Sequence, residues 1–365
     1  MKLRSYRWYR HAVCLAVSAI ALGCGVKTPP RPPCPAGAHE VQHGCEGTVA
    51  QWTSGPSLRT ARDHHVTFVA ESPAGVFLYA LAGTTPEGGA AATVERAPLR
   101  PDGSLGPFEA LADLPIALIG PGFAEVEPGL VLAGGLGVNG DSVTDTFVGG
   151  VLDDGRLELR SGPPLAHSRY HTAVVAVKGF VFALGGLQQS VSTGTPTQAV
   201  LDSVERAPFD GTTLGPWTEA ARLPTPLTHH AALAHGDAIY VIGGGSSAAA
   251  RTEILRAEVS DDGELGAFKV VGNLPAARAT SSAFVFLDHL YVLAGAASLT
   301  SGEVATVLRA PIAADGSIGA FEELAALPQA RAHSHQSPFH DGFAYSVGGS
   351  IHHVPQTEVF IGRFQ

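Results

Sequence analysis

The feature that most constrains the fold of this chain is an internal repeat with a period near fifty residues. An apolar strand that ends in glycine recurs six times, and its closing glycines are spaced 52, 51, 58, 51 and 54 residues apart. These glycines are Gly83, Gly135, Gly186, Gly244, Gly295 and Gly349. A variable polar stretch and then a second strand follow each copy. A period of this length is typical of repeat architectures, in which similar units build one body.

Tight turns divide each repeat further. Five copies continue into an Asp-Gly pair, at Asp102-Gly103, Asp154-Gly155, Asp210-Gly211, Asp262-Gly263 and Asp315-Gly316. Asp-Gly tolerates the positive φ of a tight hairpin, so each pair marks a reversal into another strand. That strand carries an aromatic residue in most copies (Phe108, Trp217, Phe268 and Phe321). The repeated unit therefore contains about four strands.

Composition agrees with a strand-rich fold. The 365 residues include 44 Gly and 26 Pro, spread along the whole chain, and only 15% are charged. Gly and Pro weaken helix interiors, so this distribution argues against a helical protein. Hydrophobic residues make up 45% of the chain, which is enough for a substantial core.

The repeats resemble those of kelch-type β-propellers, which carry a glycine pair after an apolar strand and an aromatic residue some distance later. The resemblance covers about residues 49–365 and implies an all-β, six-bladed propeller. The sixth copy stops at Gln365 without an Asp-Gly turn or an outer strand, whereas a matching segment begins at Gln51-Trp52. We therefore expect the N-terminal strand to close the last blade, which leaves no open strand edge.

Residues 1–23 have the organisation of a signal peptide. Four basic residues precede an apolar run of eleven residues, which is too short to span a bilayer. The run ends in Ala21-Leu22-Gly23-Cys24, which resembles a bacterial lipoprotein signal and implies lipid attachment to Cys24. An ordinary secretory signal and an uncleaved anchor are the alternatives. Residues 24–48 then read as a Pro-rich tether with a small loop.

Two cysteines remain after Cys14 and Cys24, and in an oxidising envelope we expect Cys34 and Cys45 to form a disulfide. The loop between them contains His39-Glu40-Val41-Gln42-His43, which matches the H-E-x-x-H pattern of zinc proteases. That chemistry needs a stable helix, a third ligand and a cleft, so we interpret the match as chance. A Cys-His-His-Cys metal knot is conceivable, and whether the motif binds metal is left open.

Two positions recur after the leucine that ends each outer strand. Arginine stands four residues later, at Arg62, Arg169, Arg278 and Arg331, and histidine stands six residues later, at His64, His171, His229 and His333. One interpretation is a ring around one mouth of the central channel, suited to an anionic or sugar ligand. The other is that these side chains satisfy loop carbonyl groups between blades, which their recurrence favours. We predict no metal site and no cofactor.

The functional expectation is a binding protein of the bacterial cell envelope. Removal of residues 1–23 leaves 19 basic against 33 acidic residues, which argues against a nucleic-acid partner. We expect a monomer, lipid-anchored at the outer membrane or cell surface, that binds protein or glycan through its channel mouth or variable loops. The alternative is a carbohydrate-active enzyme of the kelch-type sugar mutarotase or epimerase kind, and a purely structural envelope component is a third. Cysteine is absent after residue 45, which excludes copper chemistry of the galactose-oxidase type.

Overall fold

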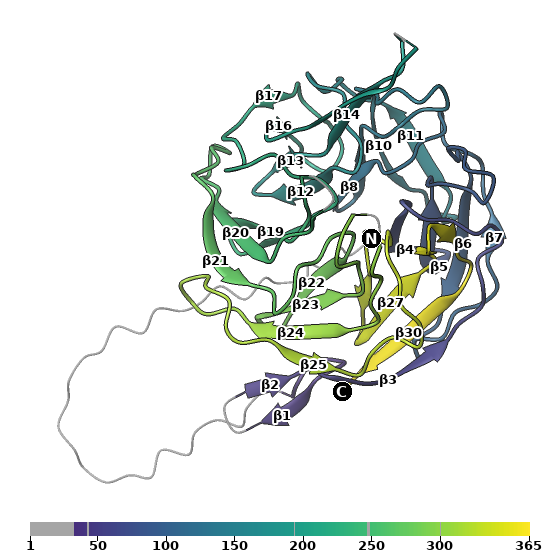
Figure 1. Cartoon of the computed structure of the whole chain (residues 1–365). Helices are drawn as coiled ribbons and strands as arrows, with labels where there is room; N and C mark the ends of the chain where they lie inside the picture. Colours follow the sequence, from purple (N-terminus) through teal and green to yellow (C-terminus); the bar gives the residue numbers. More distant parts are fainter. Residues whose placement is uncertain (1–32, 42–43, 193, 247–248, 300) are drawn as a thin grey trace, which may run out of the picture. The chain divides into compact units, whose positions relative to one another are not determined.

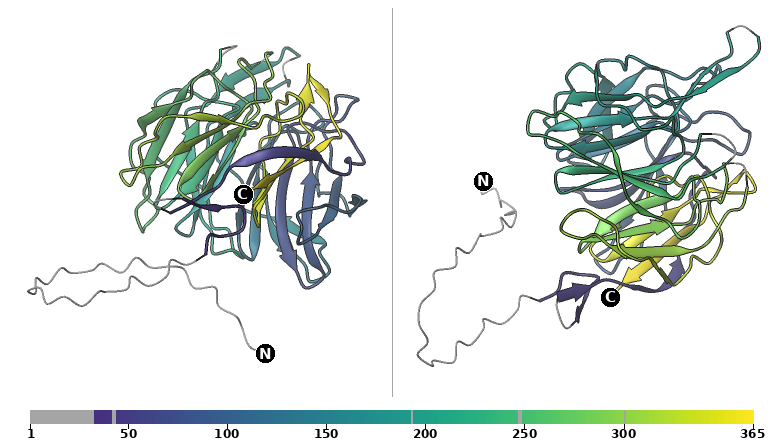
Figure 2. Two further views of the ribbon diagram at one scale, coloured as in Figure 1. Left: turned by 90° about the horizontal axis from the view of Figure 1, so that it is seen from below. Right: turned by 60° about the vertical axis from the view of Figure 1, so that its left-hand side comes forward.

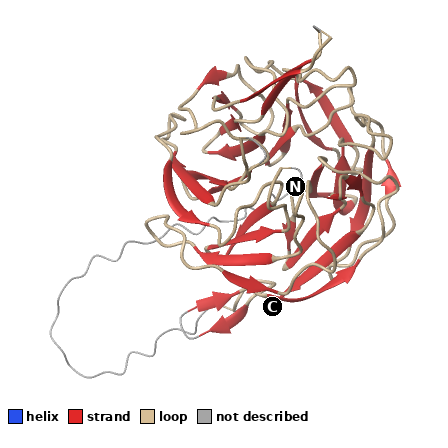
Figure 3. Cartoon of the chain, viewed as in Figure 1, coloured by secondary structure: helices blue, strands red, loops and turns tan. Residues whose placement is uncertain are grey.

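The computed structural model describes residues 33–41, 44–192, 194–246, 249–299 and 301–365, and in this part of the chain every regular element is a β-strand (Figure 3). The strands form six four-stranded antiparallel sheets and three two-stranded hairpins. The six sheets surround a central axis as the blades of a propeller (Figure 1). Among the described residues no helix has the length and apolarity to cross a membrane. The predicted all-β, six-bladed fold is confirmed.

Each blade runs from an inner strand beside the axis to an outer strand at the rim. In that order, blade 1 contains β4 (Val66–Ser72), β5 (Gly75–Leu81), β6 (Val94–Leu99) and β7 (Glu109–Ala110). Blade 2 contains β8 (Gly122–Val126), β9 (Gly129–Ala133), β10 (Thr146–Val151) and β11 (Leu157–Ser161). Blade 3 contains β12 (Ala173–Val177), β13 (Phe180–Leu184), β16 (Val204–Pro208) and β17 (Thr218–Glu219).

The other three blades repeat this order. Blade 4 contains β18 (Ala231–His235), β19 (Ala238–Ile242), β20 (Glu253–Glu258) and β21 (Lys269–Asn273). Blade 5 contains β22 (Ser282–Phe286), β23 (His289–Leu293), β24 (Val307–Pro311) and β25 (Glu322–Leu324). Blade 6 contains β26 (Phe339–His340), β27 (Phe343–Val347), β30 (Val359–Phe364) and β3 (Val49–Ser54). Two small hairpins extend from the blades, namely β14 (Leu187–Ser190) with β15 (Thr197–Val200), and β28 (Ser350–Ile351) with β29 (Val354–Pro355).

The N-terminal strand closes the ring, as the repeat count predicts. Strand β3 pairs antiparallel with β30, the last strand of the chain, and Trp52 lies opposite Gly362. The Trp52 ring is buried, and its Nε1 donates a hydrogen bond of 2.9 Å to the carbonyl oxygen of Ala325 in blade 5. A Cβ atom at Gly362 would lie 2.8 Å from this ring, so glycine leaves the space that the indole fills.

The Asp-Gly turns connect neighbouring blades as well as strands. Each of the five glycines has φ between 76° and 89°, as expected for a tight hairpin. The Tyr79 hydroxyl of blade 1 donates to the carbonyl oxygen of Gly155 in the turn of blade 2, at 2.8 Å. Tyr240 and Tyr345 make the same contact with the turn of the next blade. Blade 6 has no Asp-Gly turn, and Gly47 accepts the corresponding bond there, from Tyr291.

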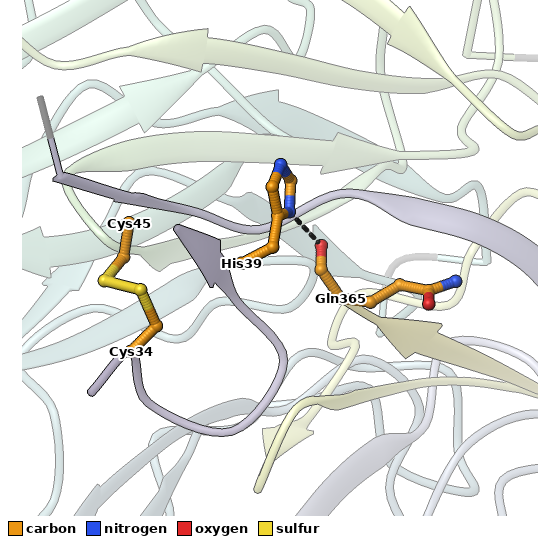
Figure 4. Close-up of a disulfide and its surroundings, with 4 residues drawn as sticks. All are labelled: Cys34, His39, Cys45 and Gln365. Carbon is orange, nitrogen blue, oxygen red and sulfur yellow. Dashed lines mark hydrogen bonds between the residues drawn. A yellow bond between two sulfur atoms is a disulfide. The ribbon is translucent and has the colours of Figure 1, made fainter. Parts of the chain in front are cut away.

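A disulfide-bonded loop precedes the first propeller strand (Figure 4). Cys34 and Cys45 are joined, and β1 (His39–Val41) pairs antiparallel with β2 (Gly44–Glu46). The His39 Nδ1 lies 2.7 Å from the carbonyl oxygen of Gln365 at the other end of the chain. The first residues of the H-E-x-x-H match are therefore in a strand rather than a helix, and residues 42–43 lie outside the described residues. The signal segment and Cys24 also lie outside them.

Candidate functional site

The four predicted arginines do not face the channel. Arg62, Arg169 and Arg331 are at most 1% exposed, and Arg278 is 5% exposed. The Arg169 guanidinium donates to a Glu205 carboxylate oxygen at 2.6 Å and to the carbonyl oxygens of Gly185 and Ser203. Burial lowers the pKa of Arg169, and attraction to Glu205 opposes this shift.

The other three arginines are also buried, and each donates hydrogen bonds to oxygen atoms of its own blade. Arg62 bonds the Glu95 carboxylate at 2.7 Å, and Arg331 bonds the Glu358 carboxylate at 3.0 Å. Arg278 has no hydrogen-bonded carboxylate among the described residues, and it donates to the carbonyl oxygen of Ala294 and the hydroxyl of Thr306. The prediction that Arg62, Arg169, Arg278 and Arg331 bind a ligand at the channel mouth is therefore wrong. Their guanidinium groups are used by carbonyl, hydroxyl and carboxylate oxygens of their own blades.

The four predicted histidines do gather on the axis. The His64 ring centroid lies 4.3 Å from that of His171 and 4.1 Å from that of His333, and the centroids of His171 and His229 are 4.0 Å apart. His335 joins them, with its ring centroid 5.5 Å from that of His64. We call these five residues the axial histidine cluster.

A ring of backbone hydrogen bonds positions this cluster. The six residues at the recurring position are His64, Gly120, His171, His229, Thr280 and His333, and all have φ between 48° and 57°. The N–H of His64 donates to the carbonyl oxygen of His333, and four further bonds of this kind follow around the axis from one blade to the next. The left-handed backbone thus aims each of these N–H groups at the preceding blade. Gly120 has space only for a hydrogen, because a Cβ there would lie 2.3 Å from the His171 ring.

Oxygen atoms hold the Nδ1 side of three of these imidazoles. The His64 Nδ1 lies 2.8 Å from a carboxylate oxygen of Asp63, and the His333 Nδ1 lies 2.8 Å from the Ser350 hydroxyl. The His229 Nδ1 lies 3.2 Å from the Thr228 hydroxyl. In each case Nδ1–H can donate outward, so that Nε2 keeps its lone pair.

Burial favours the uncharged form of four of these imidazoles. Desolvation, followed by repulsion from neighbouring histidines, lowers the pKa of His171, His229 and His333 well below the ordinary value. The same causes lower the pKa of His335 to about 3, although Asp63 partly offsets them. Both ring nitrogens of His171 are buried without a hydrogen-bond partner, as is Nε2 of His335. Three buried ring nitrogens of the cluster therefore have no hydrogen-bond partner in the described part of the protein.

A cavity of about 290 Å³ adjoins the cluster within the channel. The inner strand of every blade, or the segment leading into it, contributes to its wall. Its polar lining includes Thr67, Glu125, Thr172, Gln336 and His340, and its aromatic lining is Phe68, Phe123 and Phe339. His230 and His335 also line it, so the cavity begins where the cluster ends.

Glu125 is the most perturbed acid of the described chain. Its carboxyl group is exposed to the cavity, yet the surrounding walls desolvate it. This desolvation, with repulsion from Glu127, raises the pKa of Glu125 to about 7. Sequence reasoning missed Glu125 because it does not stand at a recurring position. The only sequence signal was its place in the inner strand of the second copy.

The variable loops provide a second surface. The variable stretch at residues 187–203 contains the β14–β15 hairpin, which projects beyond the blades (Figure 2). The side chains of Gln189, Gln198 and Tyr170 form a hydrogen-bonded network at its base.

Fold and site together define a six-bladed β-propeller with a polar cavity in its central channel. No family model matches the chain, and no curated protein matches it by sequence. Among solved structures, that of YjhT is similar to this chain, with a TM-score of 0.64 and 12% identity over 84% of this chain and 95% of the other. Likeness at this identity shows the fold alone, so membership of the kelch family stays a prediction.

Proposed function

We propose that this protein binds a small, uncharged, hydroxyl-rich ligand, of the size of a monosaccharide, in the cavity of its central channel. The cavity itself carries this proposal. Its described lining combines hydroxyl, amide and carboxyl groups with the rings of Phe68, Phe123 and Phe339. Sites for small molecules combine apolar and aromatic walls with a few well-placed polar groups in this way, and about 290 Å³ lies near the lower end of their usual volume.

The charge of the wall favours a neutral ligand. Neither lysine nor arginine is among the described residues that line the cavity, because the recurring arginines point into the blades. A carboxylate or phosphate ligand would meet Glu125 without a cationic partner, which is unfavourable in a desolvated channel. Sugar hydroxyl groups, in contrast, both donate to and accept from a carboxyl group.

The setting that we propose is the bacterial cell envelope. A lipid on Cys24 would hold the propeller at the outer membrane or cell surface, as a monomer tethered through residues 25–33. The support is the order of basic, apolar and small residues in the sequence, together with the disulfide between Cys34 and Cys45. Disulfides persist in oxidising compartments, so this disulfide supports export of the protein from the cytoplasm.

Calorimetric titration of the full chain with a panel of neutral monosaccharides tests the binding proposal. We expect saturable binding to at least one of them, and a loss of at least tenfold in affinity for Glu125→Gln and for Gln336→Ala. The matched control is Glu158→Gln, because Glu158 is exposed on outer strand β11 of the same blade as Glu125. Binding that is equally weak in all variants, or stronger for anionic sugars, would contradict the proposal.

The pH dependence gives a second measurement. With a pKa of about 7, Glu125 changes from the neutral to the charged form between about pH 6 and 8. Affinity of the unmodified protein should therefore change across this interval, whereas that of Glu125→Gln should stay constant. A constant affinity for both proteins would show that Glu125 does not contact the ligand.

A carbohydrate-active enzyme is the second candidate, and Glu125 favours it. A general acid or base works best when its pKa lies near the operating pH. Glu125 meets that condition, and His340 lines the same cavity. Arginine is absent from the described lining, so Glu125 and His340 would have to act without a cationic arginine beside them. Polarimetry on freshly dissolved anomers distinguishes the two functions, because only an enzyme accelerates mutarotation.

A further inference from the structure

The axial histidine cluster points to a ligand of a different kind from the one that fills the cavity. One ring nitrogen each of His64, His229 and His333 lies within 4.8 Å of the other two. We propose that these three residues form a metal site for Zn²⁺ or a closely related divalent transition-metal ion on the propeller axis. The proposal does not depend on sugar binding.

The backbone conformation does not explain why histidine occupies these positions. All six recurring residues adopt a left-handed conformation, in which glycine has no steric penalty. Gly120 and Thr280 occupy two of the six and take part in the same series of backbone hydrogen bonds. Histidine at the other four places therefore costs backbone strain and brings imidazole rings into contact on the axis. Neither of these effects stabilises the protein without a ligand. A bound ion would compensate for both.

The surroundings of the three rings fit metal coordination. Histidines that bind metals usually donate their second ring N–H to a carboxylate or another oxygen, which fixes the tautomer and orients the ring. Here Asp63, Thr228 and Ser350 provide one oxygen each, at 2.8, 3.2 and 2.8 Å from the Nδ1 atoms. All three Nε2 atoms are thus left as the ligand atoms, and the 4%-exposed Asp63 supplies one negative charge nearby.

The donor set selects the class of ion. Three neutral imidazoles suit zinc, copper, iron or nickel, whereas calcium and magnesium prefer oxygen. Zn²⁺ has tetrahedral geometry with Zn–N bonds of about 2.0–2.1 Å, so its ligand atoms lie about 3.3 Å apart. The ion would draw the three nitrogens together from their present separation. His171, whose two ring nitrogens lack partners, stacks on His64.

Part of the cluster is accessible. The His64 side chain is 14% exposed, although His229 and His333 are buried, so the cluster is not sealed off completely. His335 of the cluster also lines the cavity, so the cluster and the cavity are neighbours.

Titration of the metal-free protein with Zn²⁺ tests this proposal. The full chain is produced without a polyhistidine tag, stripped with a chelator and titrated by calorimetry. We expect one Zn²⁺ per chain and a higher melting temperature with the ion bound. The variant His229→Asn/His333→Asn should lose at least 100-fold in affinity, and asparagine is chosen because it tolerates the left-handed backbone. Asp63→Asn should weaken binding about 10- to 100-fold while all three ligands remain.

The control is His39→Gln, which removes the first histidine of the H-E-x-x-H match and leaves the axial cluster intact. Its affinity for Zn²⁺ should equal that of the unmodified protein. Co²⁺ provides a readout that does not rely on the variants, because a tetrahedral complex with nitrogen ligands absorbs strongly in the visible range. Absence of Zn²⁺ binding, binding that survives in the double variant, or loss in His39→Gln would each overturn the proposal. If the double variant does not fold, the Asp63→Asn affinity and the Co²⁺ spectrum decide.

Discussion

The buried pair of Arg169 and Glu205 offers the sharpest test of how the repeats are held together. Both side chains are fully buried, and their charged atoms are 2.6 Å apart. Glu205 also accepts hydrogen bonds from the backbone N–H groups of Ala166 and His167. We predict that either partner alone is costly to remove, and that removal of both is much less costly than the sum.

The magnitudes follow from these contacts. Glu205→Leu leaves a buried guanidinium without its carboxylate, at a cost of about 3–5 kcal/mol, and two N–H groups lose their acceptor. Arg169→Leu leaves a buried carboxylate, at a similar cost of about 3–5 kcal/mol. The double variant has no buried charge, and we expect a coupling energy of at least about 2 kcal/mol between the two sites.

The protein itself contains the apolar version of this pair. In blade 4 the equivalent positions hold Leu227 and Leu255, which belong to one hydrophobic cluster. Blade 2 has Leu118 and Phe147 there, again in one cluster. The double variant Arg169→Leu/Glu205→Leu thus copies a solution that the same fold already uses.

Urea unfolding of the unmodified protein, the two single variants and the double variant completes the cycle. Additive losses, within about 0.5 kcal/mol, would refute the conclusion that the pair acts as one buried unit. Single losses below about 1 kcal/mol would show that one of these groups reaches water.

Three further predictions concern other parts of the chain. Trp52→Ala should cost about 3–5 kcal/mol, because the indole is buried where β3 closes the ring; an unchanged urea midpoint would contradict the closure. Leu287→Asn should raise stability by about 1 kcal/mol, because Leu287 has φ of 50° in a two-residue hairpin and asparagine adopts this conformation more readily; a lower melting temperature would argue against strain at this turn. Cys24→Ala should move the protein out of the membrane fraction and remove acyl chains detectable by mass spectrometry, and equal fractionation of both proteins would count against the lipid anchor.

The number of blades could be predicted because each strand and turn is determined by residues that are close together in the sequence. Each glycine-ended strand and each Asp-Gly turn depends on backbone preferences within a few residues, so the sequence carries that information directly. Closure by β3 followed from a strand missing at one end and present at the other. The tyrosines whose hydroxyl groups bond the next blade also recur, at Tyr79, Tyr240, Tyr291 and Tyr345. Their recurrence is a further sequence signal for contact between neighbouring blades.

The four arginines have the structural role that their recurrence favours, and the sequence contains a second signal for it. Glutamate occupies the second position of the third blade strand in two copies, as Glu95 and Glu205. These are copies that carry arginine at Arg62 and Arg169, whereas the copies with Leu118 and Leu227 have Phe147 and Leu255 instead. In these four copies the two positions change together because they share one buried space, which predicts pairing within a blade rather than a ligand. Arg278 and Arg331 stand opposite Leu308 and Phe360 and bond other oxygen atoms of their blades.

The cavity could not be predicted in this way, because its residues are related only by the axis. A position that recurs in every copy performs a task that every blade needs, such as the ring of backbone hydrogen bonds through His64 and Gly120. Glu125 and Gln336 stand at places where the copies differ, and only closure of the ring brings them to one channel wall. A ligand that is not itself sixfold symmetric requires such differences. Specificity in this propeller should therefore reside in the inner-strand positions at which the repeats disagree, whereas substitutions at the agreeing positions should change stability first.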